Sequence, residues 1–174
     1  TLWSVTDGLK FKRRTNPKEA TIEANGLTDG MPTSKHYTHR VYDDVVTDTS
    51  VTSPEMINKT TAAWELSDKL GTEDGVFRII GTYYALHDTY RTIKDRGVPV
   101  REKPCTTGGS EDFTKAVFRS PEHLANKRRL QGPYTFGCQM LLNPTADSTQ
   151  GFKLEWLKYW PGLNHTGLNI YIVV

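Results

Sequence analysis

The residues best suited to catalysis in this sequence are two cysteines and five histidines. Cys105 or Cys138, placed beside a histidine and an acidic residue, would make a nucleophilic hydrolase, because a histidine base can activate a thiol. Cys138 has apolar neighbours in the sequence, where a thiol is usually an inert small hydrophobe, and Cys105 lies in a Pro/Gly-rich stretch that would hold catalytic geometry poorly. We therefore expect a protein that is not an enzyme. The histidines considered are His36, His39, His87, His123 and His165.

Metal, cofactor and phosphate sites have little support in the sequence. The cysteines form no Cys-x-x-Cys pair, and His36 and His39 are not at the spacing of a two-histidine helix motif. Residues 106–110 (Thr-Thr-Gly-Gly-Ser) lack the Gly-Lys-Ser/Thr ending of a phosphate-binding loop. His87 and Asp88 are adjacent, so on a strand they would point to opposite faces. We expect no metal, no cofactor, no small-molecule substrate and no disulfide framework.

Twelve of the 22 basic residues lie in three clusters, although the net charge is only +2. Apolar and aromatic residues such as Trp3, Phe11 and Val100 lie beside or within the first two clusters, a composition typical of a surface that contacts anionic lipid or nucleic acid. We expect the distribution of charge, and not its total, to carry the function. The clusters are Lys10, Lys12, Arg13, Arg14 and Lys18; then Lys94, Arg96, Arg101 and Lys103; then Lys127, Arg128 and Arg129.

Two capped helices are predicted on either side of an aromatic strand. Ser53 and Pro54 open a helix that should run to Leu70 with one apolar face, and a second Ser-Pro-Glu at residues 120–122 opens a shorter helix over residues 123–130. Residues 76–86 predict a strand for the first helix to cover. The basic Pro/Gly-rich residues 95–112 predict a long loop, which is usually functional or mobile.

The remaining strands are predicted from branched and aromatic runs between turn residues. They complete an α+β fold, which we expect to be a curved antiparallel sheet covered by two helices in a single domain. Residues 1–34 are expected to form a basic arm with loops, and residues 35–174 the α+β domain. No apolar stretch is long enough to span a membrane. The further strands are predicted at residues 3–5, 36–46, 113–119, 134–142, 152–160 and 166–174.

The order of these elements resembles the matrix proteins of rhabdoviruses over residues 36–160. The likeness is carried by residues 61–64 (Thr-Ala-Ala-Trp), 75–81 (Gly-Val-Phe-Arg-Ile-Ile-Gly), the basic loop, 120–123 (Ser-Pro-Glu-His) and 132–136 (Gly-Pro-Tyr-Thr-Phe). The resemblance implies a viral structural protein that self-assembles and bridges the envelope membrane to the nucleocapsid.

The resemblance also implies partners and sites. A basic N-terminal arm would bind anionic lipid and nucleocapsid, which places those contacts at Lys10, Lys12, Arg13, Arg14 and Lys18. A mid-chain loop would take part in self-association, which places that contact at Val98, Pro99, Val100, Arg101 and Lys103, with Lys127, Arg128 and Arg129 as a secondary basic patch. The expected location is the virion, the host cytoplasm and the inner face of the membrane.

Two alternative functions remain open from the sequence. A jelly-roll capsid subunit would also have a basic arm and a strand-rich C-terminal half, with nucleic acid as its anionic partner. A secreted carbohydrate-binding module would use Trp156, Tyr159 and Trp160 for stacking, and glycans at Asn58 or Asn164 would favour it.

Overall fold

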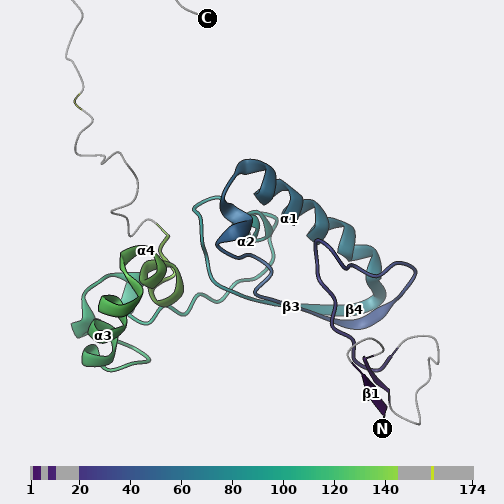
Figure 1. Cartoon of the computed structure of the whole chain (residues 1–174), viewed down its shortest axis with the longest axis horizontal. Helices are drawn as coiled ribbons and strands as arrows, with labels where there is room; N and C mark the ends of the chain where they lie inside the picture. The colour runs from purple at the N-terminus through teal and green to yellow at the C-terminus, as the bar shows by residue number, and fades with distance from the viewer. Residues whose placement is uncertain (1, 5–7, 11–19, 145–157, 159–174) are drawn as a thin grey trace, which may run out of the picture.

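The computed structural model describes residues 2–4, 8–10, 20–144 and 158 (Figure 1). Its core is a β-α-β unit followed by a short helix, and a second group of helices follows on a connecting loop. The strands are β1 (Leu2–Ser4), β2 (Gly8–Lys10), β3 (Tyr37–Asp43) and β4 (Gly71–Ile80), and the α-helices are α1 (Pro54–Ser67), α2 (Thr89–Asp95), α3 (Pro121–Gln131) and α4 (Pro133–Phe136). Short helical turns lie at η1 (Thr49–Val51), η2 (Asp68–Leu70), η3 (Thr107–Gly109), η4 (Phe113–Lys115) and η5 (Gly137–Leu141).

The prediction of a curved antiparallel sheet covered by two helices is wrong. β3 and β4 pair in parallel as a two-stranded sheet, with Tyr42 opposite Ile79 and Asp43 opposite Ile80. The antiparallel sheet in the described part of the chain is the short ladder between β1 and β2. The cause is the crossover through α1, because a strand that leaves and re-enters a sheet through a helix starts again at the same end and runs in the same direction.

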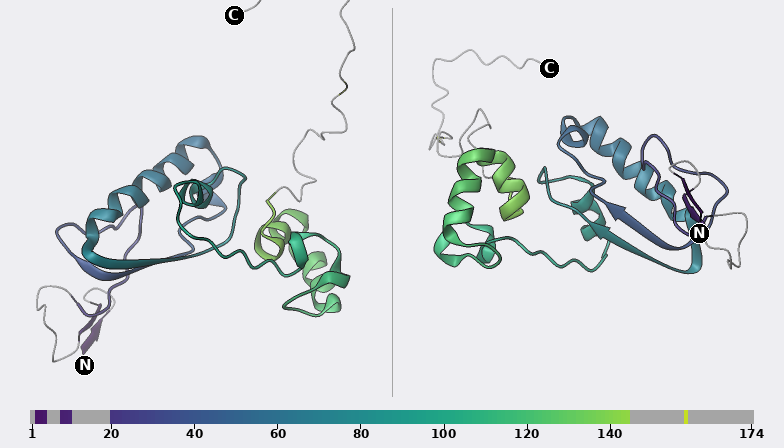
Figure 2. Two further views of the ribbon diagram at one scale, coloured as in Figure 1. Left: turned by 180° about the vertical axis from the view of Figure 1, so that it is seen from behind. Right: turned by 60° about the horizontal axis from the view of Figure 1, so that its bottom comes forward.

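The first predicted helix is confirmed, and its cap is the expected one. The Ser53 hydroxyl accepts a hydrogen bond from the Met56 amide (3.3 Å), and Pro54 occupies the first turn. Helix α1 lies along one face of the β3/β4 pair, as Figures 1 and 2 both show. Trp64 packs against the core cluster formed by Val46, Tyr90 and Ile93.

The predicted strand at residues 36–46 is confirmed as β3, which ends at Asp43 as Asp44 takes a left-handed conformation (φ 45°). The central strand, expected at residues 76–86, is β4, which begins earlier than expected, at Gly71, and stops at Ile80. A Cβ at Gly81 would lie 2.1 Å from the Tyr90 hydroxyl, which shows how closely α2 approaches the end of β4. Tyr90 donates a hydrogen bond to the Ile80 carbonyl (3.3 Å) and so fixes this junction.

The second predicted helix is confirmed as α3, but it does not cover the sheet. The Ser120 hydroxyl caps it at the His123 amide (3.2 Å), and it ends at Gly132 (φ 76°). Leu124 is buried against Phe136 and Leu141, in a core cluster separate from that of the β-α-β unit. The two parts meet where the Tyr134 hydroxyl donates to the Tyr84 carbonyl (2.5 Å).

Two further strand predictions are wrong. Residues 134–142 form α4 and η5, because Pro133 suits a first helical turn and the buried Phe136 and Leu141 lie on the side that faces α3. Residues 113–119 begin with η4, which Asp112 caps by accepting from the Thr114 amide (3.1 Å). The strands predicted at residues 152–160 and 166–174 lie, apart from Lys158, outside the described residues.

Arg40 joins β3 to the end of α1. Its Nη1 donates to the carbonyls of Ser67 (2.7 Å) and Asp68 (3.0 Å), and its Nη2 contacts the Asp68 carboxylate (3.1 Å). A Cβ at Gly71 would lie 2.6 Å from this guanidinium, so a glycine opens β4 here. A cation that binds the last carbonyls of a helix also matches the negative end of the helix dipole.

We predict that Arg40→Met lowers the free energy of unfolding by about 2 kcal/mol, because two carbonyls lose a charged donor. The matched control is Asp68→Asn, which removes only the partner carboxylate. Since that side chain is 84% exposed, the control should cost less than about 0.5 kcal/mol. Urea unfolding followed by circular dichroism measures both values, and equal losses would contradict the assigned role of Arg40.

Candidate functional site

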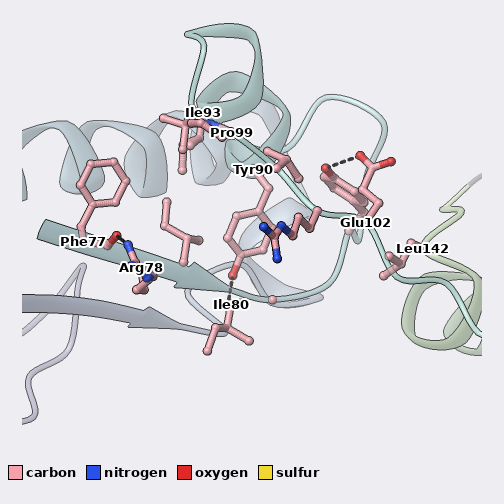
Figure 3. A pocket seen from close by; sticks show the side chains of 14 residues that line it. Phe77, Arg78, Ile80, Tyr90, Ile93, Pro99, Glu102 and Leu142 are labelled. Carbon is pink, nitrogen blue, oxygen red and sulfur yellow. Dashed lines mark hydrogen bonds between the residues drawn. The ribbon is translucent and has the colours of Figure 1, made fainter. Parts of the chain in front are cut away.

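A cavity of about 530 Å³ lies beside the end of β4 (Figure 3). Its walls come from residues 77–81, from Tyr90 and Ile93 of α2, and from the loop at residues 98–102, with Leu142 at its rim. The residues are mostly apolar, and Arg78, Arg101 and Glu102 supply charge. The sequence-predicted loop residues Val98, Pro99, Val100 and Arg101 therefore line this cavity, and Lys103 follows Glu102 in the same loop.

The loop at residues 98–103 is anchored at two points. Val98 packs against the core cluster of Val46, Tyr90 and Ile93. Glu102 accepts hydrogen bonds from Lys94 Nζ (2.6 Å) and from the Tyr83 hydroxyl (3.0 Å). The loop predicted from its prolines and glycines thus has defined attachments to α2 and to the residues after β4.

The charges around Glu102 support this anchor at neutral pH. The hydrogen bonds from Lys94 and then Tyr83 lower the pKa of Glu102, although partial burial opposes them. Burial, followed by the hydrogen bond to the Glu102 carboxylate, raises the pKa of Tyr83 to about 12. Near pH 7 a carboxylate therefore faces two protonated donors.

Apart from its two anchor residues, the loop presents an apolar and basic surface. Val100 is 45% exposed, and Arg101 and Lys103 are exposed with no ion pair to any residue that the structure describes. The other two cations of this cluster are engaged elsewhere: Lys94 with Glu102, and Arg96 with Glu65 and with the ring of Trp64 (5.5 Å). Of the four basic residues grouped by sequence, two remain available for a partner.

The other predicted basic sites that the structure describes lie on other elements. In the N-terminal arm, Lys10 ends β2, whereas Lys12, Arg13, Arg14 and Lys18 lie outside the described residues. The patch of Lys127, Arg128 and Arg129 lies on α3, away from the β-α-β unit in Figures 1 and 2. There, Arg128 pairs with Glu111 (3.0 Å) and Arg129 bonds to Asn126 (2.9 Å).

Helix α2 is the part of this site that the sequence prediction missed. Asp88, which is fully buried, caps it by accepting from the Arg91 amide (3.1 Å), and it also accepts from the Tyr84 amide (3.1 Å). Burial raises the pKa of Asp88 in spite of these bonds. An aspartate followed by apolar Tyr90 and Ile93 at helical spacing was the available signal.

The candidate catalytic groups do not converge in the described structure. His87 is exposed while its neighbour Asp88 is used as a helix cap. Burial raises the pKa of Cys105 and of Cys138, which disfavours their thiolates, and the Cys105 thiol contacts the Met140 sulfur (3.8 Å). The described residues hold no group of three or more His, Cys, Asp or Glu side chains arranged for a metal.

We predict that Glu102→Gln loosens the loop, because a neutral amide loses the attraction to Lys94. Hydrogen exchange of residues 97–103, followed by mass spectrometry at pH 7, should become about fivefold to tenfold faster. Since the pKa of Glu102 is lowered by folding, its contribution is present above about pH 4.5 and is lost as the pH falls through the folded value, so the two proteins should converge in acid. Glu73→Gln on the exposed start of β4 is the control, and an equal effect there would contradict this anchor.

No family model, curated protein or solved structure matches this chain. Across residues 20–144, the long described stretch, and the short described pieces beside it, no helix has the length and apolar character needed to cross a bilayer. We therefore infer a function from the surfaces of the chain itself.

Proposed function

We propose that this chain is a viral matrix protein, a structural protein that self-assembles and bridges an envelope membrane to a nucleocapsid. The observation that carries the proposal is the loop at residues 98–103. It is anchored through Val98 and Glu102, and it presents Val100, Arg101 and Lys103 to solvent. An anchored loop with an exposed apolar residue beside two exposed cations is suited to contact with another macromolecule, because little conformational entropy remains to be lost on binding.

The energetics favour many weak contacts acting together. A basic residue near an anionic leaflet contributes about 1 kcal/mol, so the few cations on one copy bind reversibly and lose affinity with salt. When copies associate through the loop, each bound copy raises the effective concentration of the next one at the surface. Self-association is therefore the step that turns weak lipid contact into a coat.

The outer face of the β3/β4 sheet also supports the proposal that the chain self-associates. Parallel sheets are usually covered on both faces, but here α1 covers one face only. Val41 (65% exposed), Val76 and Ile80 remain on the other face. In an assembled layer, a second copy of the chain would remove these apolar side chains from water.

The alternatives have less support from the described residues. Jelly-roll strands pair antiparallel, whereas β3 and β4 pair in parallel. Asn58 lies within α1, and Thr60, the third residue of its glycosylation triplet, donates its hydroxyl to the Met56 carbonyl (3.0 Å). Trp156, Tyr159 and Trp160 lie outside the described residues.

We predict that Val100→Asp weakens self-association at least about tenfold, because a desolvated carboxylate would have to replace a buried apolar contact. Sedimentation velocity across a concentration series measures the dissociation constant, and circular dichroism checks that the fold is kept. The matched control is Leu130→Asp on α3, whose side chain is 69% exposed, and it should associate as the parent does. Unchanged association of the Val100→Asp variant would remove the loop from the proposal.

The N-terminal cluster gives a separate prediction about lipid. Replacing Lys10, Lys12, Arg13 and Arg14 together by Ala should lower low-salt affinity for anionic vesicles by about two to three orders of magnitude, given about 1 kcal/mol for each residue. The control replaces Lys59 and Lys69, which lie outside the basic clusters, by Ala. Flotation assays measure the binding, and an undiminished affinity of the fourfold variant would exclude the arm from membrane contact.

A further inference from the structure

In the part of the chain that the structure describes, strand β4 has a free edge on the side away from β3. The Asp44 amide donates to the Ile80 carbonyl (3.0 Å), so the main-chain groups of Ile80 point toward β3. Successive residues of a strand turn their main-chain groups to opposite edges, which directs those of Phe77 and Ile79 to the free edge. Among the described residues, one of these groups, the Phe77 carbonyl, accepts a hydrogen bond from Arg78 Nη1 (3.2 Å).

The cavity described above runs along this edge. Its walls include four successive residues of β4, from both faces of the strand, and none of the described residues of β3 (Figure 3). The apolar side chains of Ile93 and Val98 also line the cavity. The site thus combines free main-chain donors and acceptors with an apolar wall, which is the pattern recognised by an added strand.

We propose that residues 169–174 of the same chain (Asn-Ile-Tyr-Ile-Val-Val) occupy this cavity as a strand added to the edge of β4. The segment has no charged side chain and is composed almost entirely of β-branched and aromatic residues, the types that favour strands. With residues alternating, Ile170 and Ile172 face the same side and match the wall formed by Ile93 and Val98.

The position of the chain favours occupation within one molecule. Leu142 lies at the rim of the cavity, so the chain leaves the described region beside the proposed site. Residues 143–168, if extended, would span about 90 Å, far more than the return requires. A tethered segment also has an effective concentration that a second molecule reaches only at high protein concentration. This inference does not depend on the matrix function.

Photo-crosslinking of the full chain tests the contact directly. With p-benzoylphenylalanine at Tyr171, which preserves an aromatic side chain, irradiation of dilute protein should link this position to residues 77–80 or 98–101 within a monomer. The control places the same group at Phe118, an exposed residue outside the cavity, where links to those residues are not expected. Links elsewhere, or links found only in dimers, would overturn the proposal.

Hydrogen exchange gives an independent measurement. Ile170→Asp combined with Ile172→Asp should speed exchange of the Phe77 and Ile79 amides about tenfold, as expected for losing about one main-chain hydrogen bond. Leu163→Asp, in the same part of the sequence but outside the segment, should leave those amides unchanged. Equal exchange in the double variant and the parent would overturn the proposal, even where both proteins remain folded.

Discussion

The parallel pairing of β3 and β4 is the constraint on which the rest of the structure depends. Because α1 returns the chain to the end of the sheet where it began, the two strands must run in the same direction, and the end of α1 must lie close to β3. Arg40 makes that approach favourable by binding the Ser67 and Asp68 carbonyls, and Gly71 leaves room for the guanidinium. This arrangement directs the end of β4 toward α2, where the Tyr90 hydroxyl donates a hydrogen bond to the Ile80 carbonyl.

The candidate site follows from this geometry. Among the residues that the structure describes, this two-stranded parallel sheet has two free edges and, with α1 as its one helix layer, one uncovered face. The loop after α2 passes along the free edge of β4 and encloses the cavity there, while Glu102 ties the loop to Lys94 and Tyr83. The same small unit therefore supplies an edge suited to an added strand and a loop surface suited to a neighbouring macromolecule.

Local signals in the sequence predicted part of this arrangement. Ser53-Pro54 and Ser120-Pro121 have direct physical consequences at helix starts, so α1 and α3 were predicted with nearly correct bounds. Strand direction depends on contacts distant in sequence, such as Arg40 with Ser67, and no local pattern reports it. Residues 134–142 have strand-like composition but pack as helix against Leu124, so tertiary contacts outweighed propensity. Val98 and Arg101, which were predicted as part of a self-association loop, line the cavity, whereas the anchoring role of Glu102 depends on a fold that composition does not reveal.

The proposed function requires this chain to coat an anionic surface by assembling on it. Co-sedimentation of the unmodified protein with anionic and neutral vesicles across a salt series, with electron microscopy of the same samples, measures this directly. We expect binding to anionic vesicles only, weakened by salt, with ordered protein layers on the lipid. Closed protein shells without lipid, or equal binding to neutral vesicles at every salt concentration, would contradict it.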